Sequence, residues 1–230
     1  AVSEYLAGRE LPTRRRFDER IIQLKGKTSE TNVAVYTYLP GSTIPWEAYT
    51  MKHIKQLGQT MSDMHAYLAD MPMGTVPSVY DEYLAIIERM DAYFSKPDVA
   101  RATNEKLNLE FDAHFDVYRR LLEQCDALLG HQVLHMDFVR GNILFENDEI
   151  SGVLDFEKTA VGSPVVDIAR TLAFLLVDCK YKSDEQVRKY FLYSGYKKRG
   201  NAKDIGDKRT RELLVELFLV YDFYKFLRHN

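Results

Sequence analysis

Two carboxylates and an amide with the chemistry for phosphoryl transfer stand close together in the sequence. Asp137 and Asn142 belong to the segment His-Met-Asp-Phe-Val-Arg-Gly-Asn, and Asp155 follows in Asp-Phe-Glu. Carboxylate and amide oxygens are hard ligands of the kind that Mg²⁺ binds, and Mg²⁺ neutralises the charge of a transferring phosphoryl group. Another carboxylate can accept the proton of an attacking hydroxyl or orient it. The set therefore predicts Asn142 and Asp155 on Mg²⁺ and Asp137 beside the attacking hydroxyl.

The elements around these side chains should bring them together. Short apolar runs at 143–145 and 150–154 flank Glu-Asn-Asp-Glu, a pattern typical of a β-hairpin with an Asn-Asp turn. Such a hairpin would place Asn142 and Asp155 at its open end. Asp137 would lie on the loop that enters the hairpin from a brief apolar strand.

From this point the sequence resembles a known group of enzymes. The pattern His-x-Asp-x-x-x-x-Asn, a pair of apolar strands and then Asp-Phe-Glu are similar to the aminoglycoside phosphotransferase, choline kinase and homoserine kinase superfamily, which has a protein-kinase-like fold. Gly-Ser-Pro-Val-Val-Asp-Ile-Ala-Arg at 162–170 extends the similarity. The helix at 57–65 and the segment Tyr-Leu-Pro-Gly at 38–41, which resembles the inter-lobe hinge, are weaker matches. The resemblance covers nearly the whole chain and is strongest over 131–175.

The resemblance implies a role for each matching residue of the site. Asp137 would be the catalytic base or would orient the hydroxyl, and Asn142 and Asp155 would hold Mg²⁺. The backbone of Thr37 and Leu39 would meet the adenine edge of ATP at the hinge, and GTP is an equal alternative as nucleotide.

Two further residues would support the site, and other interpretations stay open for their neighbours. His135 would be a strut that ties the catalytic loop to the metal-binding turn, and Asp167 would brace that loop from the following helix. Arg140 could contact phosphate or substrate, although a surface ion pair suits it better. Glu157 is either a neighbour of the metal or a solvated charge. His65 lies on an apolar helical face and is expected to be a core residue rather than a catalyst.

The fold class implied is α+β and protein-kinase-like, with a remnant of a small β-containing N-lobe and a mainly helical C-lobe that carries the catalytic hairpin. Residues 1–40 would be a partial nucleotide-binding lobe that ends at the hinge, and 41–230 the catalytic and substrate-binding lobe. Two neighbouring antiparallel strands are expected at 21–24 and 33–39. Apolar periodicity predicts helices at 45–68 (with a possible break at Gly58), 79–94, 107–129, 165–177, 184–193 and 209–227.

Parts of the nucleotide site of such an enzyme have no counterpart in the sequence. The only strand-like lysines are Lys25 and Lys27, which lie just before the hinge strand, and Glu4 is a poor candidate for the helix glutamate that pairs with such a lysine. No glycine-rich phosphate loop precedes them. We therefore expect an N-terminally truncated chain that holds ATP weakly and could be inactive. The alternative is a catalytically silent, pseudokinase-like binding module, although the intact Asp137 argues against it.

Charge is unevenly spread along the chain. Residues 61–130 contain thirteen acidic and six basic residues, whereas 179–230 contain seven acidic and thirteen basic ones. An acidic middle disfavours nucleic acid as a partner and favours a cationic small-molecule substrate, such as an aminoglycoside or an amino alcohol. Solvated acidic helix faces explain the same pattern equally well.

The sequence has no apolar run long enough to span a membrane and no basic-then-apolar leader, so neither membrane insertion nor secretion is expected. Cys125 and Cys179 have no metal-ligand spacing and are expected to be buried thiols in a reducing compartment, which favours the cytoplasm. A protein kinase and a metal hydrolase are the weaker enzymatic alternatives. The identity of the substrate and the oligomeric state are left open by the sequence.

Overall fold

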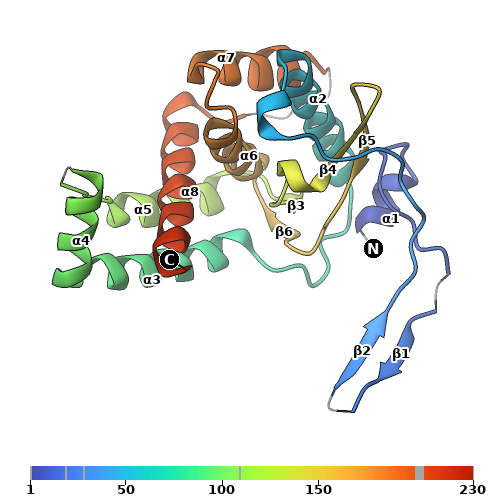
Figure 1. Cartoon of the computed structure of the whole chain (residues 1–230), viewed down its shortest axis with the longest axis horizontal. Helices are drawn as coiled ribbons and strands as arrows, with labels where there is room; N and C mark the ends of the chain where they lie inside the picture. Colours follow the sequence, from blue (N-terminus) through green and yellow to red (C-terminus); the bar gives the residue numbers. More distant parts are fainter. Residues whose placement is uncertain (1, 19, 28, 109, 200–204, 230) are drawn as a thin grey trace. The chain divides into compact units, whose positions relative to one another are not determined.

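The structure is a computed structural model that describes residues 2–229 except 19, 28, 109 and 200–204 (Figure 1). The chain divides into two compact units, each assembled from separate stretches of sequence. The first unit comprises Ala1–Met71, Asp137–Glu157 and Asp178–Ala202. The second unit comprises Pro72–Met136, Lys158–Val177 and Lys203–Asn230. Asp137, Asn142 and Asp155 all belong to the first unit. The boundary expected at residue 40 is not a boundary between these units and stays a prediction about lobes.

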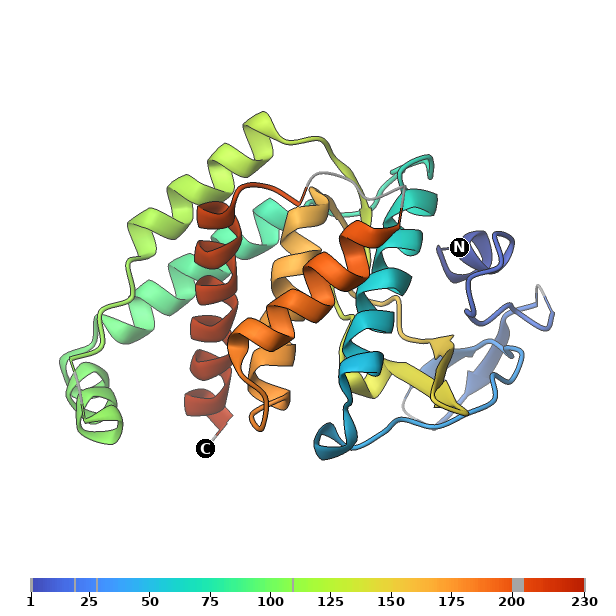
Figure 2. The same ribbon diagram turned by 90° about the horizontal axis from the view of Figure 1, so that it is seen from above.

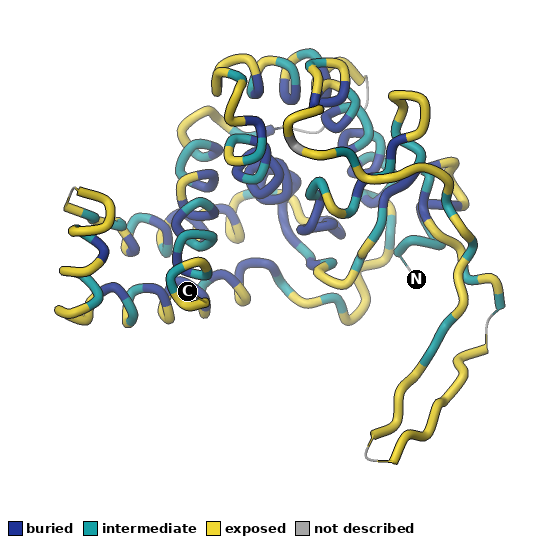
Figure 3. The backbone as a smooth tube through the Cα atoms, viewed as in Figure 1, coloured by how far each residue is buried: buried dark blue, intermediate teal, exposed yellow. Residues whose placement is uncertain are grey.

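The first unit begins with helix α1 (Val2–Ala7) and an exposed antiparallel ribbon, β1 (Ile22–Lys25) and β2 (Glu30–Val33), which Figure 3 shows to be solvent-facing. The first predicted strand is confirmed, but the second was placed too late in the sequence. The Gly26 N–H donates to the Ser29 carbonyl at 2.8 Å, which closes a tight turn and starts the pairing at Glu30. Beyond Val33, the described chain continues this pairing only as a single bridge between Arg16 and Tyr36.

Helix α2 (Met51–Leu68) follows a short 3-10 turn, η1 (Trp46–Ala48), and runs through Gly58 without a break. The predicted break is therefore wrong, and packing explains the glycine. A Cβ on Gly58 would lie 2.1 Å from the Phe191 carbonyl oxygen, and a Cβ on Gly195 would lie 2.6 Å from that of Lys55. Both glycines let α2 approach the π-helix η3 (Lys189–Gly195) more closely than any side chain would permit.

The predicted hairpin is confirmed as β4 (Ile143–Glu146) and β5 (Glu149–Val153), which lies beside α2 (Figure 1). Its turn residues Asn147 and Asp148 have φ values of 52° and 61°, the left-handed conformation that a two-residue type I′ turn requires. Lys52 of α2 pairs with Glu149 at 2.6 Å. This exposed ion pair joins the end of the hairpin to α2.

The rest of the first unit is short helical structure. It includes η2 (Arg140–Asn142), α7 (Asp184–Arg188), which continues directly into η3, and η4 (Tyr196–Lys198). The helix predicted at 184–193 is therefore regular only in its first part. Ser183 caps α7, and its side chain accepts from the Gln186 N–H at 3.2 Å.

The second unit is mainly helical. Its elements are α3 (Val79–Phe94), α4 (Pro97–Leu107), α5 (Phe115–Leu128), β3 (Gln132–Leu134), β6 (Ala160–Gly162), α6 (Pro164–Asp178, whose last residue belongs to the first unit) and α8 (Lys208–His229). Helix α8 packs against α3 and α5 (Figure 2). The prediction for 79–94 is confirmed. The helix predicted from 107 begins only at Phe115, because Asn108 ends α4 in the left-handed conformation with φ 52°.

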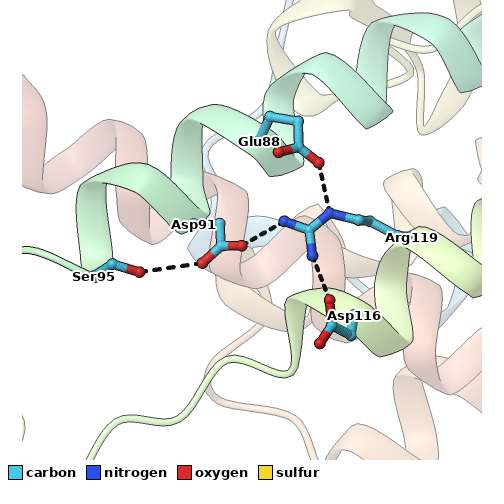
Figure 4. Close-up of polar contacts among 5 residues, drawn as sticks. All are labelled: Glu88, Asp91, Ser95, Asp116 and Arg119. Atoms are coloured by element: carbon cyan, nitrogen blue, oxygen red, sulfur yellow. Dashed lines mark hydrogen bonds and ion pairs between the residues drawn. The ribbon is translucent and has the colours of Figure 1, made fainter.

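Two arginines join helices within the second unit. Arg119 of α5 pairs with Glu88 and Asp91 of α3 and with Asp116 of its own helix (Figure 4). Arg170 of α6 is buried and donates to both carboxylate oxygens of Asp222 of α8. The contacts of Arg119 show that part of the acidity of 61–130 serves helix packing.

Both cysteines are free and buried, as expected. Burial raises the pKa of Cys125 and of Cys179 to about 11, so neither thiol ionises near neutral pH. Within the described ranges, none of the helices is both long and apolar enough to cross a bilayer.

Candidate active site

A buried carboxylate holds the backbone just before Asp137. The N–H groups of His135 and Met136 donate to the two carboxylate oxygens of Asp167, at 2.9 and 3.0 Å. His135 and Asp167 are both 0% exposed, and Met136 has a φ of 61°. This left-handed conformation is costly for a methionine, so the paired charge-assisted hydrogen bonds stabilise a strained backbone at the entrance of the loop.

The loop then folds back on Asp137. The Val139 N–H donates to the Asp137 carbonyl at 2.8 Å, and the Asn142 side-chain amide donates to that carbonyl at 2.9 Å and to the Asp137 carboxylate at 3.1 Å. Asp137 is only 8% exposed. With its Nδ2 engaged in this way, Asn142 keeps its amide oxygen for another partner, and that oxygen is the atom that can bind a cation.

Asn142 and Asp155 flank the open end of the hairpin, as the sequence predicts. The Leu154 N–H donates to the Asn142 carbonyl at 2.8 Å, one residue beyond the last strand pair. Asp155 is exposed, has a φ of 58°, and accepts the Glu157 N–H on Oδ1 at 3.3 Å. The left-handed Asp155 is a second strained position in this short stretch, and strain of this kind clusters at functional sites.

The donor set at the hairpin mouth fits a small divalent cation. It consists of one amide oxygen and one carboxylate, both hard ligands. Across the part of the chain that the structure describes, no three His, Cys, Asp or Glu side chains gather into a metal-binding group. Mg²⁺ needs no such cage, because it keeps several waters and takes substrate phosphates as ligands beside one or two carboxylates.

The segment predicted to be the hinge is joined to the same hairpin. The Ser151 hydroxyl of β5 donates to the Pro40 carbonyl at 2.7 Å. Ser42 and Phe145 exchange backbone hydrogen bonds of 3.1 and 2.9 Å. Gly41, which lies between Pro40 and Ser42, has a φ of 98°. A Cβ at this position would lie 2.3 Å from the Ser151 Oγ. Ser151 carries no motif and was missed in the sequence, since nothing in a strand pattern marks the partner of a distant carbonyl.

Thr37 is turned so that its carbonyl stays unused. Its N–H donates to the Arg15 carbonyl at 2.8 Å, but the Arg15 N–H donates to the Thr37 hydroxyl at 3.1 Å rather than back to the Thr37 carbonyl. Among the described residues, neither the Thr37 carbonyl nor the Leu39 N–H has a hydrogen-bond partner. Both groups are therefore available to a ligand.

The other residues considered from the sequence have structural partners. His65 is buried, and its Nδ1 lies 2.8 Å from the Tyr196 hydroxyl, which confirms a core role. Glu4 binds Arg16 at 2.8 Å, and Lys25 pairs with Glu30 at 3.5 Å on the exposed ribbon. Glu4 and Lys25 therefore do not pair with each other, as a lysine and a helix glutamate would in the nucleotide site of such an enzyme.

Arg140 forms the expected ion pair, with Asp178, at 3.6 Å between Nε and Oδ2. Burial raises the pKa of Asp178, and the nearby Arg140 charge opposes that shift in part. Tyr49 lies close to this pair, and burial, followed by the Cys179 and Asp178 charges, raises its pKa strongly. Asp178 had no motif in the sequence and is a further polar residue beside the loop that carries Asp137 and Arg140.

Comparisons with known proteins agree with this geometry. The homoserine kinase of Methylobacterium nodulans is 26% identical over 166 residues, which are 72% of this chain and 49% of that protein. The chain thus spans about half the length of this relative. A solved structure of an amicoumacin kinase with AMP-PNP, Ca²⁺ and Ami has a TM-score of 0.70 at 14% identity, covering 100% of this chain and 69% of that one.

The GDP and kanamycin complex of APH(2")-IIia has a TM-score of 0.58 at 16% identity, covering 89% of this chain and 65% of that one. These similarities show the α+β, protein-kinase-like fold that the sequence implied. The profile of the phosphotransferase enzyme family matches residues 1–196. With most of its length matched, the chain belongs to the phosphotransferase enzyme family.

Proposed function

We propose that the protein transfers the γ-phosphoryl group of ATP or GTP to a hydroxyl group of a small molecule. The observation that carries this proposal is the arrangement of Asp137, Asn142 and Asp155 on one loop and one hairpin. The Asn142 amide orients the Asp137 carboxylate at 3.1 Å, and the same Asn142 flanks the hairpin mouth with Asp155.

In the proposed reaction, the acceptor hydroxyl oxygen forms a bond to the γ-phosphorus as the bond from that phosphorus to the β–γ bridging oxygen breaks. The nucleoside diphosphate leaves with the bridging oxygen. Asp137 orients the hydroxyl and accepts its proton, which then passes to solvent. Bound through Asn142 and Asp155, Mg²⁺ would supply charge neutralisation to the phosphates.

The hinge is proposed to hold the base of the nucleotide. The unused Thr37 carbonyl can accept from an exocyclic amino group, and the Leu39 N–H can donate to a ring nitrogen. The Ser151–Pro40 hydrogen bond, 2.7 Å long, would keep this segment in place relative to the hairpin. An adenine matches this donor and acceptor pair, and the relatives were solved with both AMP-PNP and GDP, so ATP and GTP are both carried into the test.

The acceptor is proposed to be cationic, because acidic residues outnumber basic ones in 61–130 and would attract a positive charge. Three of these acids are bound to Arg119, and Asp63 pairs with Arg199 at 3.3 Å, so the proposal depends on the acids outside these pairs. Amino sugars and amino alcohols have both the required positive charge and a hydroxyl. Small-molecule substrates of this class would be met in the cytoplasm, which we propose as the location of the protein.

The test is transfer of a labelled γ-phosphoryl group from ATP or GTP to a panel of acceptors: homoserine, kanamycin, streptomycin, a macrolide and neutral polyols. Transfer that is lost in Asp137→Asn but kept in Asp184→Asn, an exposed residue of α7, would support the proposal. Equal turnover by the parent and Asp137→Asn would overturn the role of Asp137. Nucleotide binding without transfer to any acceptor would support the silent binding module instead, and transfer to neutral acceptors alone would remove the charge argument.

A further inference from the structure

Arg140 is the basic residue of the catalytic loop. It lies three positions after Asp137 and two before Asn142, in the 3-10 turn η2. Residues 131–178 contain eight acidic and three basic residues, so positive charge is scarce in this part of the sequence. A guanidinium retained between a proposed base and a proposed metal ligand therefore requires a specific explanation.

The hydrogen-bonding capacity of Arg140 is unused within the described residues. Its Nε is buried and has no hydrogen-bond partner. The Asp178 oxygen at 3.6 Å from Nε is near enough for charge attraction but beyond hydrogen-bond length. A buried donor left in this state is destabilising, and its place on the loop between Asp137 and Asn142 suggests that a ligand uses this guanidinium.

Two other arginines of this chain, which join helices, form more hydrogen bonds than Arg140 does. Arg170 donates to both oxygens of Asp222, at 2.8 and 3.0 Å, and Arg119 donates to three carboxylates. Both guanidinium groups donate directly to carboxylates, and both join helices. Arg140 differs from them, because its single ion pair balances its charge and leaves its N–H donors free.

Free guanidinium donors match the oxygens of a phosphoryl group. Arginine binds phosphate through two parallel N–H···O bonds, in a planar geometry that lysine cannot reproduce. Asp178 is 31% exposed and Arg140 is 40% exposed at the side chain, so the pair is held yet open to solvent. A ligand could therefore bind the guanidinium without first breaking a hydrogen bond.

We propose that Arg140 binds the phosphoryl group as it passes from nucleotide to acceptor, and that Asp178 positions the guanidinium for this contact. The inference rests on the proposed phosphotransferase function. Arg140 donates hydrogen bonds to the phosphoryl oxygens and exchanges no proton, so the bonds formed and broken are those of the transfer itself. Arg140 is the catalytic residue in this proposal and Asp178 the positioning residue.

The proposal is tested by steady-state kinetics and by binding of a transition-state analogue. Arg140→Gln should lower kcat by about 10²–10³-fold, the loss typical of removing one such donor, with KM for the nucleotide changed less than about three-fold. Arg140→Lys keeps the positive charge for the ion pair but lacks the two parallel N–H donors of a guanidinium. Its kcat should therefore be only slightly higher than that of Arg140→Gln. Asp178→Asn should lower kcat less than Arg140→Gln does, and adding it to Arg140→Gln should cost nothing more.

Binding is measured with Mg²⁺ and ADP, alone and with aluminium fluoride, which mimics the phosphoryl group in transfer. Arg140→Gln should bind ADP like the parent and lose the extra affinity that fluoride gives, whereas Arg209→Gln, an exposed arginine of α8, should keep it. Parental kcat or parental fluoride response in Arg140→Gln or Arg140→Lys would overturn the role of Arg140. A parent that transfers nothing to any acceptor would refute the proposed function instead, and the fluoride response would still decide on Arg140.

Discussion

The Asn142 amide nitrogen lies 3.1 Å from the Asp137 carboxylate, so one side chain both orients the proposed base and presents an oxygen to the proposed metal. An asparagine can do this because its amide has a donor end and an acceptor end. A carboxylate at the same position would bind the metal but repel Asp137. Asn142 thereby links the proposed proton acceptor, Asp137, to the proposed metal site.

Asn142→Asp is therefore expected to fail despite its similar shape. The new carboxylate would replace the hydrogen bond to Asp137 by like-charge repulsion. We expect kcat to fall by at least about 10²-fold. Steady-state measurement of phosphoryl transfer would check this. A variant with the parental kcat would contradict the linkage between the two residues.

Asp167→Asn should destabilise the second unit. The new amide group would place a donor against the N–H of His135 or Met136, inside a site that is 0% exposed. We expect the free energy of unfolding to fall by about 2–4 kcal/mol, measured by urea denaturation. Asp184→Asn, at the exposed start of α7, is the matched substitution and should change it by less than about 1 kcal/mol. Equal decreases in the free energy of unfolding of the two variants would show that the buried Asp167 carboxylate stabilises the protein no more than an exposed one does.

Gly41→Ala should damage the hinge. The φ of 98° disfavours alanine, and the added methyl would lie 2.3 Å from the Ser151 Oγ and 2.6 Å from the Phe145 carbonyl oxygen. We expect the free energy of unfolding to fall by about 1–3 kcal/mol and nucleotide binding to weaken. Calorimetry would measure both effects. The control is Gly130→Ala, where a Cβ meets nothing within 4 Å. Unchanged nucleotide affinity in a folded Gly41→Ala protein would separate the hinge from the nucleotide site.

Gly58→Ala reverses a general rule. Alanine in the middle of a helix is normally more stable than glycine by about 1 kcal/mol. Here the methyl would lie 2.1 Å from the Phe191 carbonyl oxygen, which belongs to backbone and cannot rotate away. We expect a lower Tm than that of the parent. A higher Tm would mean that α2 and η3 are less tightly packed than the structure has them.

The Arg170–Asp222 pair should make stability depend on pH in the acidic range. Burial by itself would raise the pKa of Asp222, but the hydrogen bonds and charge of Arg170, with a smaller contribution from Lys225, outweigh it and hold this pKa below its usual value. The contribution is complete above the unfolded-state pKa of about 3.9 and is lost as the pH falls through the lower folded-state value. The free energy of unfolding should then differ most between the parent and Asp222→Asn above about pH 4, and the difference should shrink below it.

The sequence predicted the hairpin between Asn142 and Asp155 better than it predicted several elements far from it. Asp137, Asn142 and Asp155 could be placed because an Asn-Asp turn and two apolar runs determine which ends of a hairpin meet. Periodicity found α3, which has one apolar face along its length, and it also found α8. It failed at Asn108, whose left-handed conformation interrupts a pattern that looks continuous in the sequence.

The remaining errors have a common physical origin in contacts between distant segments. Gly58 looked like a helix break because the sequence gives no sign of the η3 backbone packed against it. Strand β2 was predicted too late in the sequence, because the prediction relied on the apolar run at 33–39. In the structure, the turn closed by Gly26 determines where the strands begin to pair. Ser151 and Asp178 are polar residues without a motif, and only the structure shows what they touch.

The close packing of α2 on η3 also has a consequence for the newly made chain. His65 and Tyr196, which hydrogen-bond across this contact, are 131 positions apart. During synthesis, the apolar face of α2 with Ile54, Leu57 and Met61 leaves the ribosome long before its partner exists. At about 5–20 residues per second, that face stays uncovered for roughly 7–26 seconds, during which it is exposed to chaperones and to aggregation.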